Sequence, residues 1–544
     1  MNSLELPLWE YILIKGLINS YYASIELVIL NENENIKETL FKRIKDNWKH
    51  IIYILYIKLD QKYFKVQPDA FEPKDTTDLL YGIPIINAKP ISTKFSDRFR
   101  DEDVLKIKHH NLDILIKFGF RILRGDILES AKYGIWSYHH GDNNVNRGGP
   151  TGFWEVMENW GVTGSILQIL TEDLDKGRVL YRSFSQTDER SIHRNRNNLY
   201  WKSLSFLPRK LEELYNVGDV EFFNKVDEQN KYRRFCSNGF YSSKNLTNWK
   251  MSKIITVHLL RFIKDKIANL FYFNQWILLF SIRKGLSTSL WRFKKIIPSK
   301  DRFFADPFII QEENKYYIFF EEFIYKTNKG HISVIKMDEK GNYEKPVKVI
   351  DKSYHLSYPF IFRYLDDYFI IPESRPNKTI ELYKCLEFPF RWEFQMNLMK
   401  EIEAVDTTLF YHQNKWWLFA NIVENPGASV LDELFLFYSK ELHAKDWIPH
   451  PLNPVVSDVR KSRPAGRIFI HDGKIIRPSQ NSSKRYGSRI NINEIRILNE
   501  NEYEEIEIDS IEPNWDKQIM ATHTFNNAGN LTVIDGVLRR KRFY

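Results

Sequence analysis

The stretch Phe304-Ala-Asp-Pro-Phe308, which leads into Tyr317-Ile-Phe-Phe-Glu321, is the first copy of a pattern that recurs along the C-terminal half of the chain. Each copy has an apolar strand, a polar turn and a second strand that ends in a polar residue. The later copies open with Leu356-Ser-Tyr-Pro-Phe360, Val405-Asp-Thr-Thr-Leu409, Ser462-Arg-Pro-Ala-Gly466 and Thr522-His-Thr-Phe525. Successive copies start about 47 to 59 residues apart, which is the length of one four-stranded propeller blade.

Five copies predict an all-β, five-bladed β-propeller over residues 286–544. The residues that open and close each copy would then gather around the central axis. The expected substrate-binding residues at this axis are Asp306, Glu373, Asp406, Arg463, Arg477 and His523. A second interpretation stays open, in which these residues recur only because turns and strand ends recur from blade to blade.

The first 215 residues follow another pattern, in which helical and strand segments alternate. Leu8–Ile18 has helical spacing, whereas Ser24–Leu30, Asp113–Phe118 and Gly134–Tyr138 have the apolar character of strands. Such alternation predicts an α/β domain over residues 1–215 with a mainly parallel sheet. The chain as a whole is therefore expected to be multidomain.

Between these two regions, residues 216–285 are predicted to form a basic connector with one helix near Ile254–Leu270. A basic amphipathic helix leaves a peripheral membrane contact open. The run Arg539-Arg-Lys-Arg542 is expected to be a solvated tail. The oligomeric state is not determined by the sequence.

Composition sets the broad class of the protein. The chain has 544 residues, of which 43% are hydrophobic, 27% charged and 15% aromatic, as expected of a folded protein rich in strands or carbohydrate-facing surfaces. Its two cysteines, Cys236 and Cys385, exclude a disulfide framework and favour a reducing compartment, so we expect a cytoplasmic protein. The net charge of +9 permits an anionic partner but selects none, and without a recognisable motif we do not expect nucleic-acid binding.

A possible catalytic pair lies in the N-terminal region. His139 follows a buried strand in a loop rich in Gly and Asn, and Asp175 precedes a Gly turn that leads into the next strand. A His and an Asp at neighbouring strand ends can share a proton and stabilise a tetrahedral intermediate. Adjacent His residues on one loop rarely face one ion, so we expect no metal site there.

The spacing of these residues resembles the N10-formyltetrahydrofolate-dependent formyltransferase family over about residues 1–210. That family carries Asn-x-His, a Tyr-Arg-Gly, a Thr-Gly and an Asp-x-Gly. Here His139 is followed by Asn146-Arg-Gly148, Thr163-Gly164 and Asp175-Lys-Gly177. The resemblance implies a Rossmann-like domain and a formyl transfer in which His139 moves protons and Asp175 orients or deprotonates the attacking amine.

The same resemblance implies a folate pocket lined by Phe120, Ile122, Leu123 and Asp173. Two departures from the family pattern matter. Ser137 stands where the family has the Asn that binds the oxyanion, so a shorter hydroxyl replaces an amide donor, and loss of such a donor costs about 2.7–4 kcal/mol. The chain also begins at the helix that follows the family's first strand, which would leave the sheet one strand short and an edge exposed.

The repeat itself is similar to the propeller of plant glucosamine inositolphosphorylceramide transferases, and more remotely to five-bladed glycosidases. In the glycosidases, carboxylates from several blades act as acid and as base or nucleophile. Together the two resemblances imply an enzyme that transfers a formyl group to the amino group of a sugar nucleotide or surface glycan held by the propeller. The alternative is a glycan-binding, glycosyl-transferring or hydrolase-type protein whose formyltransferase-like domain no longer uses folate.

Overall fold

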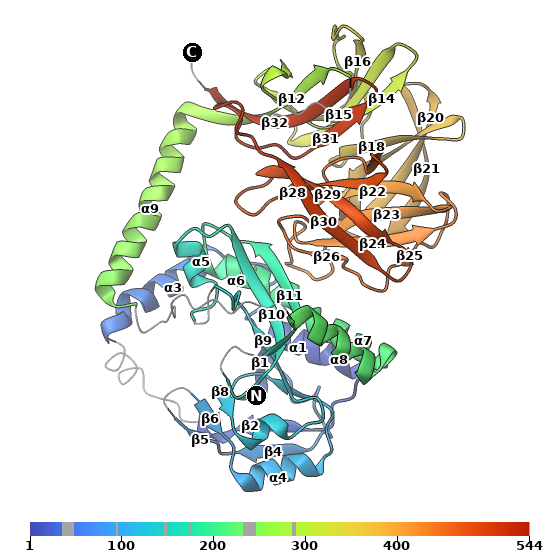
Figure 1. Ribbon diagram of the computed structural model, residues 1–544. Helices are drawn as coiled ribbons and strands as arrows, with labels where there is room; N and C mark the ends of the chain where they lie inside the picture. The colour runs from blue at the N-terminus through green and yellow to red at the C-terminus, as the bar shows by residue number, and fades with distance from the viewer. Residues whose placement is uncertain are drawn as a thin grey trace. The chain divides into compact units, whose positions relative to one another are not determined.

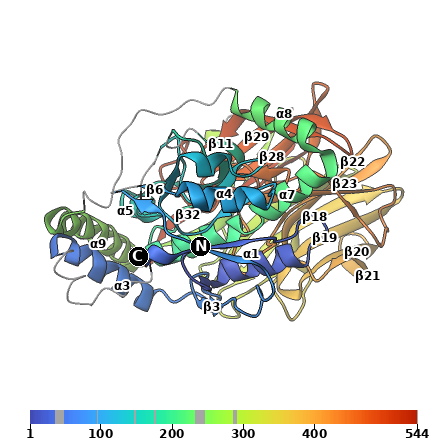
Figure 2. The same ribbon diagram turned by 90° about the horizontal axis from the view of Figure 1, so that it is seen from below.

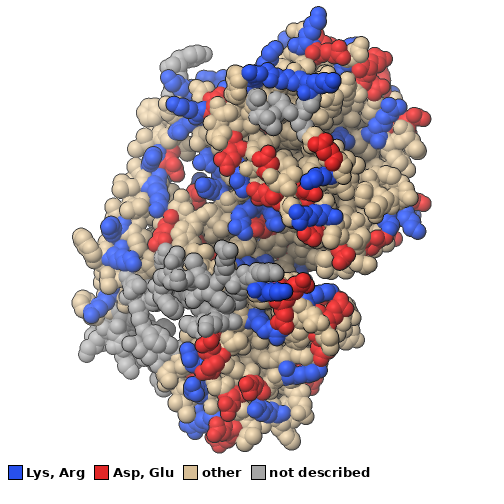
Figure 3. Space-filling model, in the orientation of Figure 1, with Lys and Arg blue, Asp and Glu red and all other residues tan. Residues whose placement is uncertain are grey.

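The computed structural model describes residues 1–34, 48–93, 96–145, 149–173, 177–231, 246–284 and 290–542, and it divides into two compact units (Figure 1). Unit 1 comprises Met1–Leu259 and Asn425–Ala428, and unit 2 comprises Leu260–Glu424 and Ser429–Tyr544. Basic and acidic side chains are interspersed over most of the face seen in Figure 3. Within the described ranges, no helix combines the length and the apolar character that crossing a bilayer requires.

Unit 2 is built from five antiparallel sheets, numbered here in chain order. Sheet 1 contains β13 (Lys294–Ile296), β12 (Tyr272–Ile282), β32 (Leu531–Lys541) and β31 (Phe525–Ala528). Sheet 2 contains β14 (Arg302–Glu312), β15 (Lys315–Ile324), β16 (Lys329–Asp338) and β17 (Val347–Ile350). Sheet 3 contains β18 (Ser357–Tyr364), β19 (Asp367–Ser374), β20 (Thr379–Glu387) and β21 (Arg391–Lys400).

The two remaining sheets follow in the same way. Sheet 4 contains β22 (Ala404–His412), β23 (Lys415–Ile422), β24 (Glu433–Ser439) and β25 (Ile448–Pro449), with β26 (Val456–Ser457) also paired to β24. Sheet 5 contains β27 (Phe469–His471), β28 (Lys474–Asn481), β29 (Arg489–Leu498) and β30 (Tyr503–Ile511). The all-β C-terminal region that the repeat predicts is therefore confirmed.

Sheet 1 joins the two ends of unit 2. β12 pairs with β32 along its whole length, from Tyr272 opposite Lys541 to Ile282 opposite Leu531. Both strands are apolar at their centres, and Leu278, Phe280, Leu531 and Val533 are buried with residues of sheet 2 in one core cluster. The backbone hydrogen bonds between β12 and β32 therefore connect the first and last strands of unit 2.

This pairing corrects two expectations. β12 lies inside residues 216–285, so that stretch is not only a connector, and it also holds helix α9 (Asn248–Phe271) and helix α8 (Asp219–Asn230). The run Arg539-Arg-Lys-Arg542 is not simply a solvated tail, because its first three residues belong to β32. The local sequence pattern did not identify β12 as a strand, because its partner β32 lies more than two hundred residues away in sequence.

Unit 1 is a mixed α/β region. Its strands are β1 (Glu5–Pro7), β2 (Val28–Asn31), β3 (Pro73–Asp75), β4 (Ile85–Ala88), β5 (Ile91–Ser92), β6 (Ser96–Arg98), β7 (Leu115–Lys117), β8 (Ile122–Arg124), β9 (Ile135–His139), β10 (Val162–Ile169) and β11 (Arg178–Gln186). Its other helices are α1 (Leu8–Ile18), α3 (Ile51–Tyr63), α4 (Asp101–His109), α5 (Phe153–Met157), α6 (Ile192–Ser203) and α7 (Phe206–Val217). Helix α1 has the bounds that the spacing predicts.

The predicted mainly parallel sheet is not what the described strands form. β2–β4, β6–β8 and β7–β9 are parallel, but β9–β10, β10–β11, β5–β6 and β1–β3 are antiparallel. Eight residues separate β10 from β11 in the sequence, and 22 residues, which include the five-residue helix α5, separate β9 from β10. The eight residues between β10 and β11 favour antiparallel neighbours, since a parallel crossover needs a dozen residues or more, whereas the longer β9–β10 connection is not limited in this way. The Rossmann-like fold implied by the resemblance is therefore not shown.

A cavity of about 510 Å³ separates two parts of unit 1. It is lined on one side by Val28 and Ile29 of β2 and on the other by Leu115 and Ile116 of β7. β2 and β7 each end their sheets among the described strands. Met1 lies beside β2, where its amino group donates to the Ile29 carbonyl oxygen at 2.8 Å. The Asn31 N–H in turn donates to the Met1 carbonyl oxygen at 3.0 Å, so Met1 is hydrogen-bonded to the edge of β2.

Candidate functional site

Three neighbouring sheets share a distorted position at the start of their first strand. The pairing of β14, β18 and β22 with the next strand is interrupted at Asp306, Tyr358 and Asp406, and these residues have φ angles of 53°, 41° and 52°. A left-handed backbone is costly for any residue with a Cβ, so such strain marks positions held by their surroundings and concentrates at functional sites. The bulges belong to the repeated openings Ala-Asp-Pro, Ser-Tyr-Pro and Val-Asp-Thr.

The side chains at and near these bulges form a cluster that we call the axial cluster, made of Asp306, Glu321, Glu373, Asp406, Arg463, Gln480, His523 and Asp535. All five sheets or the segments entering them contribute to it. Every member is buried except for Glu373, whose side chain is 11% exposed. The repeated openings and closings of the sequence therefore meet in space, as the pattern predicts.

One half of the axial cluster is an Asp–His–Asp array. His523 Nδ1 lies 2.6 Å from Asp535 Oδ2, and His523 Nε2 lies 3.2 Å from Asp306 Oδ1. Asp306 also accepts a hydrogen bond from the Thr524 hydroxyl at 2.9 Å. Burial raises the pKa of Asp306 to about 6. Burial opposes the charged form of His523, but the carboxylates of Asp535 and Asp306 outweigh it and raise the pKa of His523.

The other half is centred on an arginine. The Arg463 guanidinium contacts the Asp406 carboxylate through Nε and, at 3.2 Å, through Nη2, and Gln480 Nε2 donates to Asp406 at 2.8 Å. The Asp406 backbone N–H donates to Glu373 Oε2 at 3.3 Å. Burial, followed by the nearby Asp406 charge, raises the pKa of Glu373 to about 8. Glu373 is therefore mainly protonated at neutral pH beside the carboxylate that Arg463 compensates.

Glu321 is the remaining carboxyl group of the axial cluster, and two aromatic rings border the cluster. Burial raises the pKa of Glu321 well above its usual range, and His355 Nε2 lies 3.4 Å from its carboxyl. The ring of Trp276 lies 4.1 Å from that of His523, and Arg463 lies 4.8 Å from the ring centre of Tyr486. Both aromatic rings are partly exposed. The two rings therefore place apolar surfaces next to the many hydrogen-bond donors and acceptors of the axial cluster.

Asp306, His523 and Asp535 have ligand atoms close enough to surround a metal ion. Both ring nitrogens of His523 already face carboxylate oxygens, so a proton satisfies this array without an ion. A metal ion would take the place of the proton between a ring nitrogen and a carboxylate oxygen. The described side chains thus form an ion-pair array whose ligand atoms also lie within 4.8 Å of one another.

Five of the six residues predicted at the axis are brought together, and the sixth is not. Arg477 is buried between strands, where Nε and Nη2 each bind Glu505 at 2.7 Å. Arg477 is therefore not part of the axial cluster, because its side chain forms an ion pair within sheet 5. Glu321 and Asp535 were missed, although both close a copy of the repeat and could have been found by that rule. Trp276 and Tyr486 lie outside the repeat units and carry no comparable signal.

Two of the three catalytic residues predicted in unit 1 lie within the described residues. Ser137 is buried on β9, His139 ends that strand half-buried, and Asp175 lies outside the described residues. The neighbouring His140 stacks on Tyr200 with ring centres 3.7 Å apart, and burial lowers its pKa to about 3.

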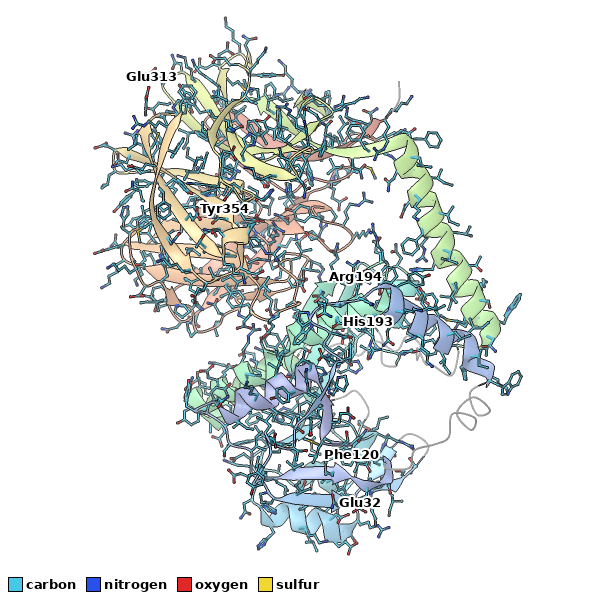
Figure 4. The ribbon with its side chains drawn as sticks, turned by 180° about the vertical axis from the view of Figure 1, so that it is seen from behind. Glu32, Phe120, His193, Arg194, Glu313 and Tyr354 are labelled. Carbon is cyan, nitrogen blue, oxygen red and sulfur yellow. The ribbon has the colours of Figure 1, made fainter. Side chains whose placement is uncertain are left out.

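The predicted folate contacts are scattered. Phe120 (Figure 4) and Leu123 line the cavity between β2 and β7, Ile122 begins β8, and Asp173 is exposed. The structure therefore does not assemble these four side chains into one pocket. Binding of N10-formyltetrahydrofolate stays a prediction of the sequence.

Known proteins resemble the C-terminal region. Residues 293–529 match the family model described as glucosamine inositolphosphorylceramide transferase 1, N-terminal. Glucosamine inositolphosphorylceramide transferase 1 of Arabidopsis thaliana is 32% identical over 209 residues, and that of Oryza sativa subsp. japonica is 31% identical over the same length. These matches cover 38% of this chain but only 27% and 28% of the two relatives, so the chain spans little more than a quarter of their length.

Solved structures show weaker likeness. A family 117 glycoside hydrolase of Zobellia galactanivorans aligns with a TM-score of 0.33 and 11% identity, covering 49% of this chain and 90% of its own. The catalytic domain of the GH62 α-L-arabinofuranosidase of Coprinopsis cinerea aligns with a TM-score of 0.34 and 8% identity, covering 49% and 96%. Similarity at this level carries no argument about function.

The expected formyltransferase activity is wrong, because the matched relatives are transferases of another type. The resemblance rested on loop spacings, and two of its pieces, Asn146-Arg-Gly148 and Asp175, lie outside the described residues. Ser137 already lacked the amide that the family uses. What the comparisons do show is that the C-terminal region matches the N-terminal family of glucosamine inositolphosphorylceramide transferase 1.

Proposed function

We propose that unit 2 is a five-bladed β-propeller whose axial cluster binds a glycan, in the service of glycosyl transfer rather than formyl transfer. The observation that carries this proposal is the convergence of acidic, cationic and aromatic side chains from five sheets at one buried position. Residues that recur only because turns recur from sheet to sheet would not need to meet at one place in the structure. Strained bulges at Asp306 and Asp406 hold two of the carboxylates there.

The chemistry of the axial cluster suits a sugar. Sugar hydroxyls need several donors and acceptors within one small site, and the Glu373 carboxyl and the Arg463 guanidinium provide both. The partly exposed rings of Trp276 and Tyr486 provide flat apolar faces against which the C–H side of a sugar ring can pack.

An amino sugar fits the charge of the axial cluster. Arg463 and His523 supply positive charge against the carboxylates of Asp306, Asp406 and Asp535, which leaves acidic groups in excess. A sugar ammonium group would compensate that excess. The name of the matched relatives, which includes glucosamine, supports the same class of ligand.

A second role, acid catalysis at a glycosidic oxygen, is favoured by one observation. Glu373 and Asp406 lie side by side, yet the pKa of Glu373 is raised to about 8 while Asp406 is compensated by Arg463. Two carboxyl groups whose environments separate their protonation are the arrangement that glycosyl chemistry uses. Glu373 would donate the proton and Asp406 would face the developing positive charge.

The test is binding of the full chain to an array of immobilised glycans that includes glucosamine and N-acetylglucosamine ends. We expect selective binding that Glu373→Gln and Trp276→Ala each weaken by about tenfold or more. Asp366→Asn is the matched control, since that side chain is fully exposed on a hairpin of sheet 3. Equal binding by all four proteins, or binding to none of the glycans, would contradict the proposal.

A further inference from the structure

Helix α9 presents an apolar stripe to solvent. Leu260, Ile263, Ile267 and Leu270 recur three or four residues apart, which places them on one face of the helix together with Phe271. Each of these five side chains has half or more of its surface exposed. A helix of a globular protein normally turns such a stripe toward the core. Here the core-facing side chains are others, since Met251 and His258 are the buried residues of α9.

Basic residues flank this stripe. The 24 residues of α9 include Lys250, Lys253, Arg261, Lys264 and Lys266, and Asp265 is the single acidic residue of the helix. Figure 3 shows basic side chains along the helix interspersed with uncharged ones. An exposed apolar stripe edged by cations is the pattern of a helix that lies in a membrane interface.

A basic cavity lies at the C-terminal end of α9. It has a volume of about 820 Å³ and is lined by Tyr272, Lys300, Lys517, Gln518, Leu538, Arg539, Arg540 and Lys541. Five of these eight residues are cationic, and no carboxylate is among them. The Arg539 guanidinium lies 4.6 Å from the ring of Tyr272, which directly follows the helix.

The stripe and the basic cavity are tied to one another. The Arg542 backbone N–H donates to the Phe271 carbonyl oxygen at 2.9 Å, and Arg542 Nε donates to the Asn269 carbonyl oxygen at 2.8 Å. The end of the chain therefore lies against the last turn of α9, as the views of Figures 1 and 2 also show. The five residues of the stripe and the lining of the basic cavity all belong to unit 2.

We propose that this surface docks on an anionic phospholipid bilayer, with the stripe of α9 in the boundary between headgroups and acyl chains and the basic cavity on lipid phosphates. Phosphates account for the cationic lining, and the acyl boundary accounts for the exposed apolar side chains. A nucleic acid would satisfy the cations but leave the stripe in water. The inference is independent of glycan binding at the axial cluster.

The experiment is flotation of the full chain with phosphatidylcholine vesicles and with vesicles that also contain phosphatidylserine. We expect binding only to the anionic vesicles and a decrease with added salt. Ile263→Ser with Ile267→Ser should weaken binding by about tenfold or more. Arg539→Ala with Lys541→Ala should weaken it by roughly fivefold for each charge removed.

Leu365→Ser is the matched control, because this apolar side chain is exposed on a distant hairpin of sheet 3 and should bind as the parent does. Absence of vesicle binding, or binding that the stripe variants leave unchanged, would overturn the proposal. Two further results would also overturn it. One is binding of inorganic phosphate without vesicle binding, and the other is a parent dimer that Ile263→Ser with Ile267→Ser dissociates.

Discussion

Replacement of Glu373 by Gln should change how the stability of unit 2 depends on pH. Burial and the charge of Asp406 raise the pKa of Glu373 to about 8 in the folded protein, against an ordinary value of 4.5. Between these two pH values the folded chain keeps a proton that the unfolded chain releases. The free energy of unfolding therefore falls by about 1.4 kcal/mol for each pH unit in this window, and the loss is complete above the folded pKa.

Gln cannot lose that proton, so Glu373→Gln should lack this part of the pH dependence. Other groups titrate in the same window, but they cancel in the difference between variant and parent. The variant should therefore gain on the parent as the pH rises from about 5 to about 8, by about 3–6 °C in unfolding midpoint per pH unit for a region of this size. Calorimetric scans of both proteins across this range measure the effect.

The control is Asp366→Asn, which removes an exposed carboxylate and should keep the pH dependence of the parent. Parallel curves for Glu373→Gln and the parent would refute the reasoning. Such a result would mean that Glu373 is ionised in the folded protein at neutral pH and is not available as a proton donor.

Two further predictions separate structural residues from site residues. Glu505→Gln leaves the buried Arg477 without its partner and should lower the free energy of unfolding by about 3–5 kcal/mol in denaturant titrations. The control Glu504→Gln changes an exposed neighbour and should lower it by less than about 0.5 kcal/mol. Equal costs would refute the buried ion pair. Gly466→Ala should lower the free energy of unfolding by more than about 4 kcal/mol, because φ is +127° and a Cβ would lie 2.1 Å from a backbone oxygen. Gly473→Ala, where φ is +75° and the space is open, should lower it by about 1–2 kcal/mol. A similar midpoint for both alanine variants would contradict the close approach at Gly466.

The axial cluster could be predicted from the sequence because its residues sit at fixed places in a repeat. Asp306 and Asp406 open their copies, and Glu373 and Asp535 close theirs, so the repeat brings them to one axis. Gln480 closes the fourth copy, and Arg477 lies three positions before it on β28, so the alternation of a strand places the two side chains on opposite faces. The ion pair between Arg477 and Glu505 of β30 reveals that difference.

Unit 1 was predicted less well from the sequence than the axial cluster. Helix α1 follows from local spacing, and its bounds are as expected. The direction of β10 and β11 depends on how short the connections between strands are, and the apolar character of a strand does not encode direction. The function implied by the His139 loop rested on spacing alone, and spacing does not assemble the side chains that the chemistry needs.

The most direct test of the account is a crystal structure of the full chain soaked with the glycan that binds most strongly on the array. The account predicts a sugar ring packed on Trp276 or Tyr486, with polar atoms within hydrogen-bond distance of Glu373 and Arg463. A sugar bound only in unit 1, or on a face of unit 2 remote from Asp406, would contradict the axial cluster as the binding site.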